Sequence, residues 1–323
     1  ADFAKMRSSP WSWHLWDSYN FPATVNFGYE FYRPGAYAHR QKLEKENSPF
    51  IKSPFLRADI FVTNFANAFV VAKQPTYSAI LHAGPVGSQR PDDNLAQFPG
   101  PMGLGGGPLS AFWTPQAGPV ILCLRMGMSF DKSFDVLDAW RTWPIHAVSG
   151  VTAAGKIFSS ARNAIPEVTV EIKDNGGTVK VGGGLVAMNI LKNPAASDKE
   201  QAGDLMYDIA LEGKTVYSRT FKIDDKGVRV ETTVSGDGKD NIGELNETIP
   251  VYFGSGQSQK TNANTRIEFK ADGEWTPATD QYTEKVQAVR LTRFAGAVQI
   301  TFDKARRIKL SPAEWQDKWL NRG

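Results

Sequence analysis

Short runs of aromatic and β-branched residues, each followed by glycine, proline, asparagine or aspartate, constrain the fold of this chain more than any other feature. Five such runs lie between residues 55 and 127: FLRADIFVTN, AFVVAKQ, YSAILHAG, LSAFWTP and PVILCLRMG. Runs of this kind are typical of β-strands, and the residues between them favour turns. Similar runs recur from residue 145 to residue 304. The sequence therefore predicts an all-β protein, a large antiparallel β-sandwich of the supersandwich type.

Helix signals are confined to short segments. DKSFDVLDAWRTW, at 131–143, is the best internal candidate, and SPAEWQDKWL places Ser311 as an N-cap before a short terminal helix over 311–323. Residues 1–24 are expected to form a connector that docks through its tryptophans. The sandwich is then expected to cover 25–310, as one domain or as two subdomains that meet near 131–145. Within it, residues 204–236 are predicted to form a three-stranded meander.

Composition and charge exclude several classes of protein. The 323 residues are 41% hydrophobic and 22% charged, which is ordinary for a folded chain. The 37 basic and 34 acidic side chains leave a net charge of only +3, so nucleic acid is not an expected partner. No run approaches the roughly 20 apolar residues of a membrane helix, so no membrane span is expected. The single cysteine, Cys123, excludes an internal disulfide, and its apolar surroundings favour a buried structural thiol.

The first residue of the chain bears on its cellular location, and one basic segment bears on its charged partners. The chain begins at Ala1, as a processed secreted protein or an excised fragment would, so a secreted or periplasmic location is expected. The segment RFAGAVQITFDKARRIKL ends in a basic cluster, but its alternating apolar residues indicate strands with solvated outer faces. A local cluster of basic residues is sufficient to bind an anionic polysaccharide, so such a polysaccharide remains a candidate partner.

Any imidazole chemistry must use one of four histidines. His14 lies among tryptophans and His146 opens an apparent strand, so packing roles are favoured for both. His82 ends the run YSAILHAG before a Gly-Pro turn, where its ring could face a ligand at the rim of a sheet or simply bond a nearby loop. His39 lies near Tyr37 and Arg40, a trio that could handle a carboxylate and a proton, although an ordinary surface loop explains it equally.

Two further sets of residues bear on metal and phosphate binding. His39, Asp59 and His82 could converge from adjacent strands, and two imidazoles with a carboxylate are a legitimate zinc set. GPMGLGGGP is not a phosphate-binding loop, because it lacks the G-K-[ST] ending and is followed by a strand-like run. A flexible or tightly turned loop beside a binding cleft is the better interpretation.

Several phrases, taken together, resemble one family. They are YSAILHAGPVG, GGGPLSAFWTPQAGPVILCLR, WPIHAVSG followed by GKIFSSAR, and GELNETIPVYF. In pattern and order, over residues 20–310, they resemble the β-sandwich half of bacterial heparinase II/III-like proteins, polysaccharide lyases in which a helical toroid precedes a large antiparallel sandwich. The resemblance implies β-elimination of uronate-containing polysaccharide, and in some members a structural zinc.

The resemblance also implies roles for individual residues. Tyr37, His39 and His82 are the candidates for proton transfer, and Arg40 or Arg90 for pairing with the substrate carboxylate, with Trp113 as a substrate-binding aromatic. The helical toroid of the family is absent from these residues. Either this chain works with a helical domain or partner chain, or the sandwich serves a non-catalytic role in assembly or carbohydrate binding.

Overall fold

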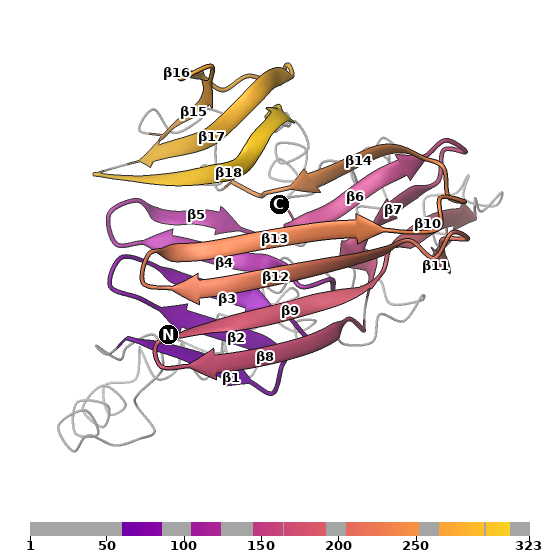
Figure 1. The fold of residues 1–323 in the computed structure, drawn as a ribbon, viewed down its shortest axis with the longest axis horizontal. Coiled ribbons are helices and arrows are strands. Elements are labelled where there is room, and N and C mark those ends of the chain that lie inside the picture. The colour runs from indigo at the N-terminus through magenta and orange to yellow at the C-terminus, as the bar shows by residue number, and fades with distance from the viewer. Residues whose placement is uncertain are drawn as a thin grey trace, which may run out of the picture. The chain divides into compact units, whose positions relative to one another are not determined.

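The computed structural model describes residues 60–85, 105–123, 145–163, 165–191, 205–251, 265–293 and 295–310. The chain divides into two compact units, Ala1–Ile60 and Phe61–Gly323. Every described strand belongs to the second unit, and the strands form four antiparallel sheets (Figure 1). Among the described residues the one helical segment is a short 3₁₀ turn, η3 (Ser160–Arg162).

The first sheet is a simple meander in which each strand pairs with the next along the chain. Its order is β1-β2-β3-β4-β5. The strands are β1 (Phe61–Phe65), β2 (Phe69–Lys73), β3 (Ser78–His82), β4 (Leu109–Thr114) and β5 (Gly118–Leu122).

The next two sheets are joined by strands that leave one sheet and enter the other. The second has the order β11-β10-β7-β6-β14, and the third has the order β13-β12-β9-β8. Only Leu185 separates β9 from β10, and β13 leads to β14 through a short loop, so the chain changes sheet at these points. The second sheet comprises β6 (Ala147–Thr152), β7 (Ile157–Ser159), β10 (Val186–Leu191), β11 (Leu205–Ala210) and β14 (Ile242–Thr248). The third comprises β8 (Glu167–Lys173), β9 (Gly176–Gly184), β12 (Val216–Asp224) and β13 (Gly227–Ser235).

The fourth sheet contains the C-terminal strands, in the order β16-β15-β17-β18. They are β15 (Thr265–Ala271), β16 (Glu274–Pro277), β17 (Thr283–Arg293) and β18 (Gly296–Ile308). Arg293 attaches this sheet to the turn between β4 and β5, because its Nε donates to the Ala117 carbonyl at 2.7 Å.

One apolar core is shared by the first, third and fourth sheets. It includes Val70 and Leu81 from the first sheet, Phe221 from the third, and Phe269 and Val286 from the fourth, all at most 1% exposed. Figure 1 shows the β1–β5 meander behind the β8, β9, β12 and β13 sheet. Two sheets that cover one apolar core form a sandwich, which confirms the predicted all-β antiparallel fold.

One detail of the prediction is wrong. The three-stranded meander over 204–236 is reduced to the β12–β13 hairpin, because β11 pairs with β10 in a different sheet. The predicted connector at 1–24, the internal helix at 131–143 and the helix at 311–323 lie outside the described residues.

Candidate functional site

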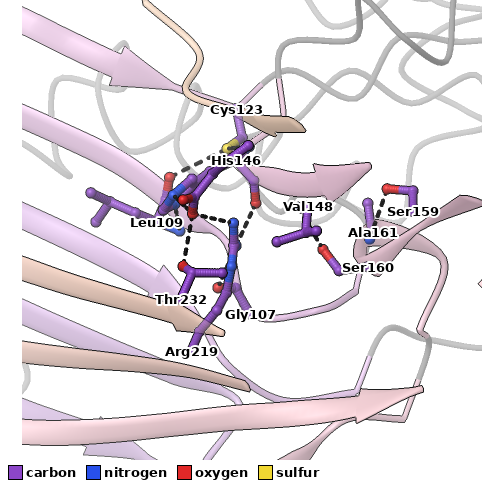
Figure 2. A network of polar contacts seen from close by, with 11 residues as sticks. Gly107, Leu109, Cys123, His146, Val148, Ser159, Ser160, Ala161, Arg219 and Thr232 are labelled. Carbon is purple, nitrogen blue, oxygen red and sulfur yellow. Dashed lines mark hydrogen bonds and ion pairs between the residues drawn. The ribbon is translucent and has the colours of Figure 1, made fainter. Parts of the chain in front are cut away.

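A buried arginine lies at the centre of the most connected polar cluster among the described residues (Figure 2). Alternate residues of β12 point inward, and Arg219 takes one of these inward positions between Tyr217 and Phe221. Its side chain is 0% exposed. A guanidinium in such a place needs acceptors, since an unpaired buried charge is costly.

Arg219 finds those acceptors on three other segments. Its Nη1 donates to the His146 carbonyl at 2.8 Å and to the Gly107 carbonyl at 3.4 Å. Its Nη2 donates to Glu247 Oε1 at 2.9 Å. The cluster therefore connects β12 with the loop before β4, the start of β6 and the end of β14. The Nε atom of Arg219 is buried without a hydrogen-bond partner.

His146 is held in one tautomer by its two neighbours. The Leu109 amide donates to His146 Nδ1 at 3.0 Å, so the proton of the neutral ring lies on Nε2, which is 3.3 Å from Glu247 Oε1. Burial lowers the pKa of His146, the Arg219 charge lowers it further, and the contact with Glu247 only partly opposes both. The ring is therefore neutral at physiological pH, with both nitrogens engaged.

Glu247 is the member of the cluster that reaches the surface, with its side chain 35% exposed. Its Oε1 atom accepts from three donors: the His146 ring, Arg219 and the Thr232 hydroxyl, the last at 2.9 Å. Burial raises the pKa of the Glu247 carboxyl, but the His146 hydrogen bond, the Arg219 charge and the Thr232 hydrogen bond outweigh it and lower the pKa to about 2. Glu247 is therefore ionised at any physiological pH.

The glycine loop before β4 is packed tightly against the cluster. Residues 105–108 are buried, and Gly106 and Gly107 have φ of +83° and +70°. A Cβ on Gly107 would lie 2.5 Å from Val181 Cγ1, so only glycine fits here. Of the two forms expected for this loop, the tightly turned one is present over the described residues 105–108.

Cys123 is inert in this arrangement. Its Sγ accepts from the His146 backbone amide at 3.4 Å and donates to the Leu109 carbonyl at 3.3 Å. The thiol is 0% exposed, and burial raises its pKa to about 12. Because the thiolate is the nucleophile, Cys123 has the structural role that its apolar run predicts.

The group that the cluster presents to solvent, the Glu247 carboxylate, is a hydrogen-bond acceptor held in a fixed position. A carboxylate with a pKa near 2 is a weak base at neutral pH, so Glu247 suits acceptance of hydroxyl hydrogen bonds better than proton abstraction. The His146 ring donates through Nε2 to Glu247 and accepts through Nδ1, so its present geometry orients the carboxylate rather than transferring a proton.

The structure describes two of the predicted site residues. His82 ends β3, as expected, but its ring is 3% exposed and is stacked on Phe69 with ring centroids 4.6 Å apart. Trp113 lies in β4, half-buried, in register with Ser78 and Pro119. The functional roles of both stay predictions. The other candidates, Tyr37, His39, Asp59, Arg40 and Arg90, lie outside the described residues.

The predicted zinc set is therefore described only at His82. Within the described ranges, no group of three or more His, Cys, Asp or Glu side chains is arranged to hold a metal ion. The set with His39 and Asp59 stays a prediction.

Sequence reasoning missed Arg219 and Glu247 and assigned His146 to packing. A signal for Arg219 was present, because an arginine at an inward position of a strongly alternating strand implies a buried charge with a partner. Glu247 offered no such signal, since β14 is a polar edge strand of the second sheet.

Comparison with known families, curated proteins and solved structures finds no match to this chain. Over the part of the chain that the structure describes, no helix is long and apolar enough to cross a membrane.

Proposed function

We propose that this chain is the β-sandwich component of a carbohydrate-acting protein of the polysaccharide lyase type. Its substrate is a uronate-containing polysaccharide, cleaved by β-elimination with the help of a helical toroid domain or partner chain. A secreted or periplasmic location in a bacterium belongs to the same proposal.

One observation carries the proposal: the phrases behind the family resemblance supply residues to a single cluster. GGGPLSAFW supplies Gly107 and Leu109, PVILCLR supplies Cys123, WPIHAVSG supplies His146, and GELNETIPVYF supplies Glu247. Residues far apart in the sequence thus form one polar arrangement that reaches the surface at a carboxylate. A pattern that only reflected strand propensity would not be expected to converge in this way.

The geometry of the cluster supports the roles proposed for Glu247, His146 and Arg219, and the other roles come from the family resemblance. Glu247 is a permanently ionised acceptor for sugar hydroxyls, and His146 and Arg219 fix its position. Proton transfer is assigned to Tyr37, His39 and His82, and pairing with the uronate carboxylate to Arg40 or Arg90. A role for His82 requires the ring to become accessible, since it is 3% exposed in this structure. A structural zinc on His39, Asp59 and His82 is the alternative role for these residues, because a histidine that ligates zinc cannot also transfer the proton.

The test is the formation of unsaturated uronate ends, followed by ultraviolet absorbance, on a panel of uronate polysaccharides. The complete protein is used, together with its helical partner where the two are separate chains. We expect turnover by the wild type and a loss of about 10²–10⁴-fold in His39→Ala, because general acid–base catalysis contributes that much. His14→Ala is the matched control and should retain activity. Absence of turnover on every polysaccharide would sink the lyase proposal.

A non-catalytic carbohydrate-binding or assembly sandwich is the second candidate. It is favoured by the burial of both described histidines, His82 at 3% and His146 at 4% exposed. Polysaccharide binding without turnover would support the binding form. Self-association without polysaccharide binding would support the assembly form.

A further inference from the structure

The end of β18 carries a concentration of positive charge that the buried cluster does not use. We call Lys304, Arg306, Arg307 and Lys309, together with Tyr282, the basic strip. β18 alternates between half-buried and exposed positions up to residue 303, but all residues from 303 to 307 are exposed. At this end of an edge strand, both faces of the backbone therefore reach solvent.

The cations of the strip gather around one exposed aromatic ring. Tyr282 is 41% exposed, and the Arg307 guanidinium carbon lies 3.9 Å from its ring centroid. Lys309 Nζ lies 4.7 Å from the same centroid. Arg307 and Lys309 are two residues apart on an extended segment, so they project to the same side of it. Cation–π attraction holds the two charges beside the ring.

Carboxylates within the protein neutralise only part of this charge. Arg307 Nε is 2.8 Å from Glu284 Oε1, and Arg306 Nη2 is 2.5 Å from Asp303 Oδ1. All four side chains are at least 48% exposed, and exposed pairs of this kind contribute little free energy. An anionic ligand can displace them cheaply. Among the described residues Lys309 has no carboxylate partner.

The strip is held in place by the core beneath it. Ile308 and Leu310 alternate with the cations and pack against the apolar core. Ile308 pairs in register with Thr283, and the Leu310 amide donates to the Thr279 carbonyl at 2.8 Å. The backbone that presents Arg307 and Lys309 is therefore fixed before a ligand arrives, which lowers the entropic cost of binding.

We infer that the basic strip is a binding surface for an acidic polysaccharide, with uronate carboxylates paired to Arg307 and Lys309 and a sugar ring packed beside Tyr282. This inference rests on the proposed function for its choice of ligand. It adds to that function the surface of the protein that would hold the polysaccharide. The small net charge of +3 for the whole protein argues against nucleic acid as the natural ligand.

The test is the affinity of the complete protein for polygalacturonate, measured by titration calorimetry at low and at physiological salt. The variant Arg307→Gln/Lys309→Gln removes two charges of the strip. The matched control, Lys222→Gln/Arg229→Gln, removes two exposed charges that share Glu231 on β12 and β13, at 3.1 and 3.7 Å. Melting temperatures verify that both variants fold.

We expect the strip variant to bind polygalacturonate about tenfold more weakly than the wild type does. The control variant should bind with an affinity within about twofold of the wild type. The affinity of the wild type should fall as the salt concentration rises. Neutral dextran should not bind. Equal affinity in the strip variant and the wild type would overturn the inference, as would no binding of polygalacturonate at all. Tighter binding of single-stranded DNA would overturn the choice of polysaccharide.

Turnover measured on the same samples separates the two proposals. If the wild type degrades polygalacturonate and the strip variant binds it with wild-type affinity, the inference about the basic strip is wrong and the lyase function stands. If the strip variant loses binding while no sample turns over any polysaccharide of the panel, the inference about the basic strip stands and the lyase function is wrong.

Discussion

Replacing Arg219 with methionine tests whether the buried cluster holds the sheets together. The substitution keeps most of the side-chain volume but removes the donors to the His146 and Gly107 carbonyls and to Glu247. Three acceptors then lose a partner. Breaking a buried ion pair from one side typically costs about 3–5 kcal/mol.

Two features of the structure lower that figure for Arg219. Glu247 is 35% exposed, so water can replace part of the lost interaction. The Arg219 Nε atom is already buried without a partner, and its removal relieves a cost of about 1 kcal/mol. We therefore expect Arg219→Met to lower the free energy of unfolding by about 2–3 kcal/mol.

The measurement is urea unfolding followed by tryptophan fluorescence, with the m-value compared between variants. Arg229→Met is the control, because Arg229 is 71% exposed and lies 3.7 Å from Glu231; it should cost at most about 0.5 kcal/mol. A double-mutant cycle with Glu247→Gln should give a coupling of about 1–2 kcal/mol. Equal effects of the two arginine substitutions, or additivity in the cycle, would refute the reasoning.

Two further predictions concern pH and the glycine loop. The folded pKa of His146 lies below its usual 6.5 and that of Glu247 is lowered from 4.5 to about 2, so the unfolded chain binds protons first in both cases. The contribution of both groups to the free energy of unfolding should therefore be fully present above about pH 6.5 and fall in two stages on acidification. The first stage, below about pH 6.5, comes from His146, and the second, between about pH 4.5 and 2, comes from Glu247. For Glu247 the loss is about 1–2 kcal/mol after allowance for its exposure. Thermal melting across pH should show a smaller second stage in Glu247→Gln than in the wild type, since Asp240, whose pKa is also lowered, titrates in both proteins; identical profiles would contradict the assignment. Gly107→Ala should destabilise by at least about 2 kcal/mol, because φ is +70° and the new methyl group meets a β9 valine at 2.5 Å. Gly155→Ala, at φ +80° with nothing within 4 Å, isolates the backbone cost of about 1 kcal/mol by the same urea assay, and equal losses would refute the steric argument.

The strands were predictable where burial alternates strongly. β12 alternates exposed and buried positions over almost its whole length, and it lies within the residues 204–236 that the sequence predicts to be strands. The burial pattern of β14 has no buried position, so apolar periodicity carries no signal for that strand. The pairing of β11 with β10 was missed because strand pairing across a change of sheet leaves no local pattern in the sequence.

The candidate site was less predictable than the fold for a related reason. Arg219 was recognisable in principle from its inward register, but its partners come from residues 107, 146 and 247. Long-range convergence of this kind depends on the order of strands in three sheets. All three partners lie in the segments that carry the family resemblance, and it was the structure that brought them together.

Under the two proposals, the electrostatics of the cluster and of the basic strip give them different parts in holding an acidic sugar chain. In the buried cluster the Arg219 charge is balanced by Glu247 and His146 is neutral, so the cluster has no net charge to attract an anion. The exposed Glu247 carboxylate would repel a uronate carboxylate and accept only from hydroxyl groups. The basic strip has the opposite character, since its cations exceed its carboxylates. On the proposed function, attraction for the acidic polysaccharide would therefore come from the strip and other arginines, and a sugar bound at the cluster would present its hydroxyl edge to Glu247.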